Sequence, residues 1–562
     1  MKRSGHPRIV VVGASAAGLK AASRARRLLP EASILVLDES ASISFGACGL
    51  PYYLAGEVDD IRALATTPFQ VVRDPKYFDE FKDVEVRIRH RVESLNVGTR
   101  TLEVTDLESG ARQTVSYDEL VLATGSAPKR IPGVGVDAEL AGPLKTMEDA
   151  VRLRRALVQG AIKSIVLVGA GALGCELAEA FRISWGCEVG IVEAAGCVLP
   201  EMLDAELGSV VQRHLAENKV LVECGHPVTH VSHSKGQIAV DTESATVFGD
   251  RVIFAIGVTP RAQLAREAGI ELGALGGIRI DEQMRTSAPH VYAAGDCVEV
   301  RSAVHGDPLL LPLGSIAVRQ GRVVGDNLAG RASKLSSVAG SAILRVFDLN
   351  VASTGLTRAA AERRGMSVSC VWGTFSDVPH YYPGGNELFL AMVYEQGSER
   401  LVGLQAVGKA DVLRSIDVFG NLLLKRGTIE DLIDAEFGYA PPYSSPLDPL
   451  HELAALAIAQ EREGLRAIAP SESLRGRLVV DVRQLTETDE HPFRCSHLLP
   501  VPLGELRKCM DELPESEMVL MCEKGPRAIE AARFLMGMGR RNICYAGGGR
   551  ALREASCCIR SS

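Results

Sequence analysis

A single cysteine in a run of small and aromatic residues is the position best suited to chemistry. Cys48 lies in the segment 44–53, and no second cysteine lies four or five positions from it. Without such a partner, the thiol cannot form a short-range internal disulfide that stores electrons. The reactive form of cysteine is the thiolate, which cationic surroundings favour. The pattern predicts one redox-active thiol that attacks a disulfide or sulfane sulfur; the alternative is a buried, unreactive cysteine.

The residues before Cys48 predict a unit that binds a dinucleotide. An apolar strand over 9–12 leads into a small-residue turn, a helix over 19–29 follows, and the next strand ends at Asp38. Glycine lets the backbone approach a pyrophosphate at the helix start, and the acid can bind a ribose hydroxyl. The predicted contacts in the turn are Gly13, Ser15, Ala16, Ala17 and Gly18.

The same pattern occurs a second time. An apolar strand leads into the complete G-x-G-x-x-G of Gly169, Gly171 and Gly174, and the following strand is closed by Glu193. One such motif is weak because any tight strand-to-helix turn favours glycine, but two in one chain predict two bound nucleotides. A carboxylate at Glu193 would accept a ribose 2′-hydroxyl and repel a 2′-phosphate, which favours NADH over NADPH.

Two later segments look like the completion of the first unit. One is a strand that runs into a small-residue turn, and the other is a buried strand that ends in an acid able to bond the ribityl or phosphate region of a flavin. The positions concerned are Ala123, Thr124, Gly125, Gly295 and Asp296.

Composition fits an intracellular enzyme of several domains. The 562 residues suggest three or four domains, and 46% hydrophobic with 23% charged residues is ordinary for globular proteins. The net charge of −8 gives no reason to expect nucleic-acid or membrane binding, and we find no signal peptide or bilayer-spanning run. The 13 scattered cysteines contain no C-x-x-C pair. We therefore expect no metal site, no disulfide scaffold and a cytoplasmic location.

Together these motifs resemble those of the two-dinucleotide-binding-domain flavoprotein disulfide reductases. Within that superfamily, the segments around Cys48 and over 439–445 resemble coenzyme A-disulfide reductases, and the similarity extends to about residue 455. The resemblance implies an α/β fold with two Rossmann-like domains and an α+β dimerisation domain. It also implies FAD and NADH as cofactors and a homodimer that acts on a small thiol, disulfide or persulfide. The implied domains are 1–145 with 275–335 for FAD, 146–274 for NADH and 336–455 for dimerisation.

The resemblance also implies a site for coenzyme A, whose phosphates need cations. Three of the residues that match it share one helical face because they are spaced by four and three positions, although a solvated basic face is the alternative. Family members often carry asparagine before the active cysteine, whereas this chain has Ala47, which removes a polar contact. The residues that match the coenzyme A site are Lys20, Arg24, Arg27, Ser44 and Lys76.

In the resembled family, tyrosines of the partner subunit close over the active cysteine. Tyr382 and Tyr443 match those positions. A phenol can donate a hydrogen bond to a thiolate or protonate a leaving thiolate. Tyr381 and Tyr439 are expected to be packing residues. The resemblance therefore implies that the active site needs a dimer.

The composition changes after residue 455. A linker is expected over 456–476, where serines and a proline gather. The segment 477–562 resembles an α/β rhodanese domain, with a strand feeding a loop from Cys522 to Arg527 and a helix after it. Successive N–H groups in such a loop can hold a thiolate or persulfide. Cys522 and Arg527 are expected to be catalytic. The alternative is a degenerate, inactive rhodanese fold.

Joining a thiol reductase to a sulfur-carrying domain predicts an NADH- and FAD-dependent reductase of coenzyme A persulfide, polysulfide or coenzyme A disulfide. Cys522 would receive sulfane sulfur and Cys48 would reduce it. One alternative is an NADH oxidase or peroxidase in which Cys48 cycles through sulfenic acid. A histidine beside the first glycine turn would favour that alternative, but position 15 is serine. Another is a redox-sensing flavoprotein whose rhodanese tail binds partners.

Overall fold

The computed structural model describes residues 6–131, 136–137, 140–234 and 236–556. The chain forms two compact units. One unit contains Met1–Gly169, Leu177–Gly190 and Val228–Val338, and the other contains Ala170–Glu176, Ile191–Pro227 and Ala339–Ser562. Within the described ranges no helix is long and apolar enough to cross a membrane, and no group of three or more His, Cys, Asp or Glu side chains could hold a metal ion.

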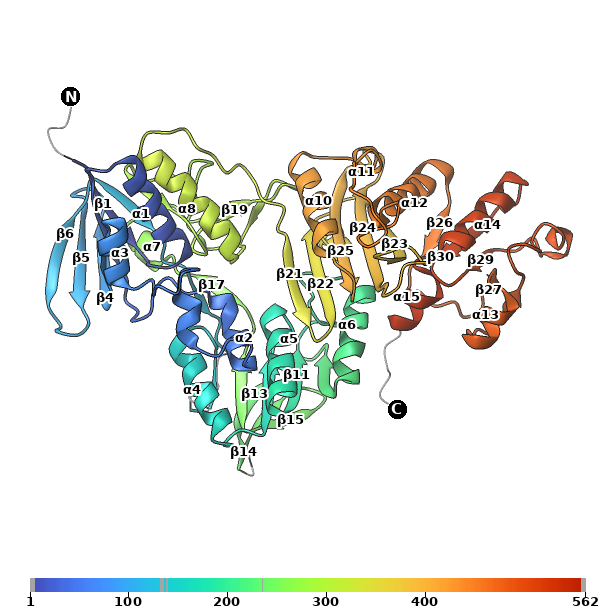
Figure 1. Cartoon of the computed structure of the whole chain (residues 1–562), viewed down its shortest axis with the longest axis horizontal. Helices are drawn as coiled ribbons and strands as arrows, with labels where there is room; N and C mark the ends of the chain where they lie inside the picture. The colour runs from blue at the N-terminus through green and yellow to red at the C-terminus, as the bar shows by residue number, and fades with distance from the viewer. Residues whose placement is uncertain (1–5, 132–135, 138–139, 235, 557–562) are drawn as a thin grey trace. The chain divides into compact units, whose positions relative to one another are not determined.

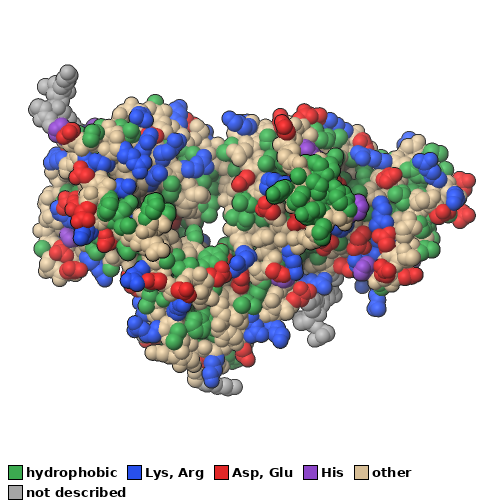
Figure 2. Space-filling model, viewed as in Figure 1, with side chains coloured by type: hydrophobic (Ala, Val, Ile, Leu, Met, Phe, Trp, Pro, Cys, Tyr) green, Lys and Arg blue, Asp and Glu red, His purple; other side chains and the backbone are tan. Residues whose placement is uncertain are grey.

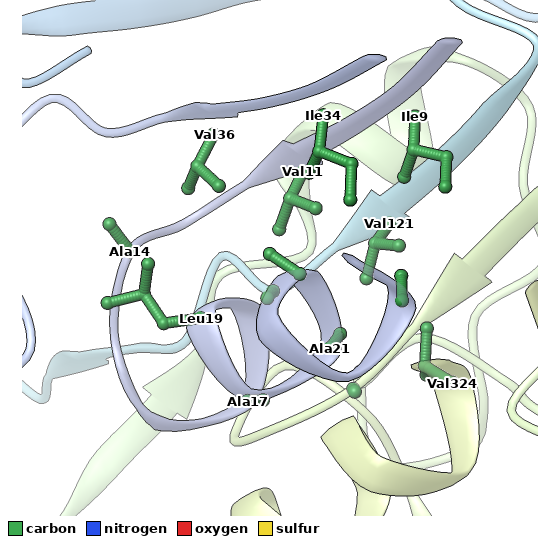
Figure 3. Close-up of a cluster of buried hydrophobic side chains, with 14 of the residues drawn as sticks. Ile9, Val11, Ala14, Ala17, Leu19, Ala21, Ile34, Val36, Val121 and Val324 are labelled. Carbon is green, nitrogen blue, oxygen red and sulfur yellow. The ribbon is translucent and has the colours of Figure 1, made fainter. Parts of the chain in front are cut away.

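A five-stranded parallel sheet organises the first unit, as the predicted α/β class requires. Its strands occur in the order β18-β7-β1-β2-β3, and the continuous apolar runs of the first four are typical of parallel strands covered on both faces. Val11, Ile34 and Val121 from three neighbouring strands lie over Ala17 and Ala21 of helix α1 (Figure 3). The elements are β1 (Arg8–Val12), β2 (Ser33–Leu37), β3 (Glu85–Arg87), β7 (Glu119–Leu122), β18 (Val291–Ala293) and α1 (Ala16–Leu28).

Helix α8 (Gly314–Leu328) lies directly against α1, and the two ribbons run side by side in Figure 1. A Cβ added at Gly321 would lie 2.4 Å from the carbonyl oxygen of Ala17, and one added at Gly325 would lie 2.5 Å from Cβ of Arg24. Two glycines one helical turn apart therefore allow the close approach of the helices.

The second glycine motif follows strand β10 (Ser164–Val168). In the first unit β10 pairs in parallel with β16 (Arg251–Phe254), which pairs in parallel with β9 (Ala141–Gly142). The chain after β10 forms α5 (Ala172–Glu179), the short helix η3 (Ala180–Ser184) and β11 (Glu188–Glu193). The predicted succession of strand, glycine turn, helix and strand is therefore present in both nucleotide motifs.

An antiparallel sheet is the centre of the 339–449 segment in the second unit. Its order is β21-β22-β25-β24-β23, which leaves β23 as an edge strand. Helix α10 (Leu413–Leu424) packs on β25 and β22, and α12 (Pro449–Glu463) packs on β23. The strands are β21 (Ala342–Val346), β22 (Leu349–Gly355), β23 (Val368–Ser376), β24 (Glu387–Glu395) and β25 (Leu401–Gly408).

The tail, residues 464–556, forms its own parallel sheet in the order β26-β30-β29-β27-β28. Within the segment 456–476, where a linker is expected, α12 continues to Glu463 and β26 begins at Arg466. Ile468 of β26 is buried and pairs with Ala546, so tertiary pairing makes a strand of a segment too short to show alternation. The elements are β26 (Arg466–Ile468), β27 (Leu478–Asp481), β28 (Leu498–Pro500), β29 (Met518–Met521), β30 (Ile543–Ala546), α13 (Leu485–Glu490), α14 (Pro526–Gly537) and α15 (Gly549–Ala555).

The tail covers the edge strand β23. The Gly548 N–H donates to the carbonyl of Trp372 at 3.1 Å, and the Thr374 hydroxyl donates to the carbonyl of Gly548 at 2.6 Å. Lys524 Nζ donates to Ser376 Oγ at 3.1 Å and lies 3.9 Å from Glu387. An uncovered edge strand is a liability for aggregation, so these contacts protect β23 and fix the tail on it.

Candidate active site

Cys48 lies on the short helix η1 (Ala47–Gly49), and it is the one exposed cysteine among the described cysteines. The segment is fixed to η2 (Ile61–Ala65), because the Gly46 N–H donates to the carbonyl of Leu64 at 2.9 Å. A Cβ added at Gly49 would lie 2.3 Å from a Leu64 methyl group, so the backbone approaches that side chain closely. The thiol is therefore held on a fixed turn and remains accessible to a substrate.

Helix α2 (Leu50–Ala55) follows Cys48 and is held from two sides within the first unit. The Trp185 indole N–H donates to the carbonyl of Leu54 at 2.7 Å. The Arg154 guanidinium lies 4.3 Å from the centre of the Tyr53 ring, a cation–π contact. These contacts restrict movement of the segment that carries the thiol.

The glycine turn lies beside the Cys48 segment, and Ser44 links the two. The Ser44 N–H donates to the carbonyl of Ala14 at 3.0 Å, and Ser44 adopts a left-handed φ of 53°. The Ala14 N–H in turn donates to the Asp38 carboxylate at 2.6 Å. The structure thus brings together Ser44, the predicted ribose-binding acid and the turn predicted to hold the pyrophosphate.

Both glycine turns use the same local geometry. Gly13 and Gly169 have φ of +112° and +107°. A Cβ added at Gly13 would lie 2.1 Å from the carbonyl oxygen of the residue directly after β7, and one added at Gly169 would lie 2.6 Å from that of the residue directly after β16. The Glu193 carboxylate accepts the Ala170 N–H at 2.7 Å, as Asp38 accepts the N–H that follows Gly13. Only glycine fits at the first position of each turn, which explains the two motifs physically.

The Gly295–Asp296 turn also meets the first glycine turn. A Cβ at Gly295 would lie 3.2 Å from Cβ of Ala17, and the Gly295 N–H donates to Gln320 Oε1 at 2.7 Å. The Asp296 carboxylate accepts the Ser126 hydroxyl at 2.8 Å. Lys145 Nζ also donates to Ser126 Oγ, at 3.2 Å. Ser126, Lys145 and Gln320 were not predicted from the sequence because their contacts span long stretches of chain.

The predicted cationic face of α1 is only partly available to a ligand. Arg24 forms an ion pair with Asp326 at 2.6 Å, and Lys76 lies 3.7 Å from Glu80 in its own helix. Lys20 is half-buried and Arg27 is exposed. Figure 2 shows Lys and Arg side chains gathered over α1 and α8. Helix α8 carries two further exposed cations that were not predicted from the sequence: Arg319 and Arg322.

The other described cysteines are less accessible than Cys48. Cys297 is fully buried, and its thiol donates to the carbonyl of Ala294 at 3.4 Å. Burial raises the pKa of Cys297 and of Cys175, so both stay protonated at neutral pH. Cys187 and Cys370 are also buried. These positions behave as small core residues.

The predicted tyrosines lie on two loops of the second unit, and both are accessible in the single chain. Tyr443 is 75% exposed and Tyr382 is 36% exposed. Tyr381 and Tyr439, expected to be packing residues, are also exposed, and their hydroxyl oxygens lie 3.3 Å apart. All four phenols are therefore accessible in the isolated chain.

Cys522 lies at the carboxyl end of β29, at the start of the predicted six-residue loop. Its side chain is 1% exposed, and its sulfur accepts the Gly525 N–H at 3.1 Å. Arg527, predicted to be catalytic, donates two hydrogen bonds to Glu487 of α13, at 2.6 and 2.7 Å. The loop thus provides an N–H donor to the sulfur, while its arginine is engaged by a carboxylate.

Comparisons with known proteins agree with this geometry. The family model "Pyridine nucleotide-disulphide oxidoreductase" matches residues 7–321, and the model of that family's dimerisation domain matches residues 341–449. An NADH oxidase of Methanocaldococcus jannaschii is 32% identical over 446 residues, which cover 79% of this chain and 97% of the relative. An NAD(P)H coenzyme A polysulfide/persulfide reductase of Pyrococcus horikoshii is 30% identical over 448 residues, which cover 80% and 97%.

One solved structure resembles nearly the whole chain. The structure of an NAD-dependent persulfide reductase from A. fulgidus has a TM-score of 0.93 and 34% identity, and covers 97% of this chain and 99% of its own. The similarity therefore includes the tail as well as the family-matched segments. On these matches, the chain belongs to the pyridine nucleotide-disulphide oxidoreductase family, whose members use FAD and NAD(H), and it carries that family's dimerisation domain.

Proposed function

We propose that the protein is an NADH- and FAD-dependent reductase of coenzyme A persulfide, polysulfide or coenzyme A disulfide. The observation that carries the proposal is the exposed Cys48 on a fixed segment that Ser44 joins to the first glycine turn. Bound FAD would relay the electrons of NADH to this thiol. The names of relatives from Pyrococcus horikoshii and A. fulgidus support the persulfide chemistry.

In the proposed cycle the Cys48 thiolate attacks the sulfur–sulfur bond of the substrate. With a disulfide, a bond forms between Cys48 and one half, and the other half leaves as a thiolate with the bonding electron pair. Two electrons and a proton then release the bound thiol and restore Cys48. Because no cysteine lies four or five positions from Cys48, the oxidised state in this proposed cycle would be a mixed disulfide with the substrate thiol.

Coenzyme A fits the charge of the surface beside this site. Its phosphates require cations, and the two helices carry Lys20 and Arg27 (α1) and Arg319 and Arg322 (α8). Arg24 would bind a phosphate of coenzyme A only after leaving Asp326. Otherwise its ion pair with Asp326 would hold α1 against α8. Ser44 lies between α1 and Cys48 in the sequence, and its N–H is hydrogen-bonded to the turn at the start of α1.

A homodimer would complete the site. The exposed Tyr382 and Tyr443 belong to the segment matched by the dimerisation-domain model. Contributed by the partner subunit, a phenol would donate a hydrogen bond to the Cys48 thiolate or protonate a departing thiolate.

We also propose that the tail is a rhodanese domain that carries sulfane sulfur on Cys522. Its five parallel strands and the loop N–H donor to the Cys522 sulfur support this assignment. Backbone N–H groups that point into a loop stabilise an anionic sulfur. The whole-chain similarity to a persulfide reductase structure supports a role of the tail in the same chemistry.

A second candidate function is an NADH oxidase, because the relative from Methanocaldococcus jannaschii carries that name. Oxygen or peroxide chemistry would oxidise Cys48 to a sulfenic acid. Position 15, beside the first glycine turn, is Ser15, which cannot serve as the general acid or base that a histidine would provide there.

Stopped-flow kinetics separates the two functions. The NADH-reduced enzyme is mixed with coenzyme A persulfide, hydrogen peroxide or oxygen. The proposal predicts fast reoxidation by the persulfide and slow reoxidation by the other two. Faster reoxidation by oxygen or peroxide would establish the oxidase instead. Intact-mass measurement before and after dithiothreitol then tests for coenzyme A bound through a disulfide.

A further inference from the structure

Every charged side chain of the Cys522 loop already has a protein partner. Glu523 pairs with Arg550 at 2.6 Å and with Arg483 at 3.2 Å. Lys524 points to Ser376 and Glu387 at the ends of β23 and β24. Small anionic sulfur donors such as thiosulfate need a free cation beside the attacking sulfur. Both cations of this loop are instead bound to carboxylates and a hydroxyl of the protein.

Glu487 is the residue that binds the Arg527 guanidinium. It accepts both guanidinium hydrogen bonds, and its Oε2 also accepts the Gln484 N–H at 2.9 Å in a capping box of α13. The hydrogen bonds from Arg527 lower the pKa of Glu487 to about 2, so the carboxylate stays charged throughout the physiological range. The two side chains are equally accessible, at 34% exposure each. A carboxylate fixed in this way is a permanent competitor for the arginine.

We propose that Glu487 is a specificity-determining residue that excludes donors with a sulfonate on the reacting sulfur, such as thiosulfate, from the Cys522 loop, so that Cys522 takes sulfur from persulfides and polysulfides instead. This inference rests on the proposed function of Cys522 as a sulfur carrier. An alkyl persulfide carries the charges of its parent thiol away from the reacting sulfur, so it does not need Arg527. Thiosulfate carries a sulfonate directly on that sulfur and would also meet the carboxylates of Glu487 and Glu523.

The two transfers differ in their leaving group. With an alkyl persulfide, the Cys522 thiolate attacks the outer sulfur, a bond between Cys522 and that sulfur forms, and the alkyl thiolate leaves with the electron pair of the broken bond. With thiosulfate, the same attack expels sulfite, which leaves with the electron pair. A cation at Arg527 would bind the sulfonate in the ground state and stabilise the departing sulfite.

The test is a steady-state assay of thiosulfate with cyanide as sulfur acceptor, which measures thiocyanate from the full-length enzyme. Glu487→Gln keeps the shape and a hydrogen bond to Arg527 but removes the charge. We expect it to lower the KM for thiosulfate about tenfold, because one hydrogen bond to a charged group contributes on this order. The matched control Glu490→Gln removes an equal charge from an exposed position of the same helix and should leave the KM unchanged.

The double variant Glu487→Gln with Arg527→Met should not show the lower KM for thiosulfate, because the freed Arg527 guanidinium is what lowers it. Glu487→Asp keeps the carboxylate that binds Arg527, so it should leave the KM for thiosulfate within about twofold of wild type. Circular dichroism and the melting temperature of each variant establish that it is folded. No gain in a folded Glu487→Gln, or an equal gain in Glu487→Asp, would overturn the inference.

Peptide mapping of Cys522 after treatment with an alkyl persulfide distinguishes failure of the inference from failure of the proposed function. Loading of Cys522 at similar rates in wild type and Glu487→Gln is the expected result. If wild type loads from the persulfide but the thiosulfate KM does not respond to Glu487, the specificity role alone is wrong. If Cys522 gains sulfur from neither donor in any variant, the carrier role and the specificity role are both wrong.

Discussion

Gly13→Ala tests the first glycine turn most sharply. The added Cβ would lie 2.1 Å from the carbonyl oxygen of Ala123 and 2.7 Å from its carbonyl carbon. To remove this steric clash, β1 and β7 must separate by about 1 Å, because Cβ contacts shorter than 3.0 Å essentially never occur. The separation weakens the hydrogen bond from the Ala123 N–H to the carbonyl of Val12, now 2.8 Å long.

The expected cost follows from two terms. Alanine at a φ of +112° costs about 1–2 kcal/mol, and loss of the backbone hydrogen bond adds about 1 kcal/mol. A total of about 2–3 kcal/mol leaves most domains folded, but it lowers the melting temperature by about 4–12 °C in a domain of this size. The displaced turn should no longer bind the pyrophosphate of FAD, so the purified variant should lack flavin.

The assay compares flavin absorbance per protein and melting temperature with those of a matched control. Gly171→Ala is that control, because a Cβ added at Gly171 would meet no atom within 4 Å, and the equivalent position of the first turn already holds Ser15. The control should keep wild-type flavin content and stability. Full flavin content in Gly13→Ala, with an unchanged melting temperature, would refute the steric reasoning.

Three further predictions concern the second nucleotide, the tail and its contact with β23. Glu193→Ala should reduce the preference for NADH over NADPH by more than about tenfold at constant flavin content, because the carboxylate repels a 2′-phosphate; a wild-type preference for NADPH in steady-state kinetics would contradict this role. Cys522→Ser should leave reduction of coenzyme A disulfide intact and depress turnover of polysulfide, and equal loss on both substrates would place Cys522 in every cycle. Lys524→Met should slow polysulfide turnover about threefold to tenfold, because the lost hydrogen bond to Ser376 helps to fix the Cys522 loop on β23. Persulfide loading of Cys522 should not change. Lys508→Met, an exposed lysine of the tail paired with Glu505, is its control, and an equal effect of both variants would exclude a specific contact.

The sequence predicted the parts of the fold that depend on local geometry. Gly13 and Gly169 were recognisable because a strand-to-helix turn with a positive φ requires glycine, and Asp38 and Glu193 because an acid at the end of the next strand reaches that turn. Accessibility of Cys48 agrees with its predicted reactivity.

The parts that depend on long-range contacts were not predictable. Residues 466–468 lie where serines and a proline predict a linker, but pairing with β30 makes them a strand. Glu487 meets Arg527 across 40 positions, and Lys524 meets Ser376 across 148. No spacing rule connects residues so far apart, so the occupied state of the Cys522 loop became apparent only in the structure.

The measurement that tests the central claim most directly is reoxidation of the NADH-reduced flavin by coenzyme A persulfide in Cys48→Ser. Stopped-flow absorbance should show that NADH reduces the flavin at the wild-type rate, because the substitution is conservative and the thiol acts after this step. Reoxidation by the persulfide should fall about a thousandfold, as expected when the nucleophile of a covalent step is removed. Reoxidation of Cys48→Ser at the wild-type rate would contradict the account, because the electrons would then reach the substrate without this thiol.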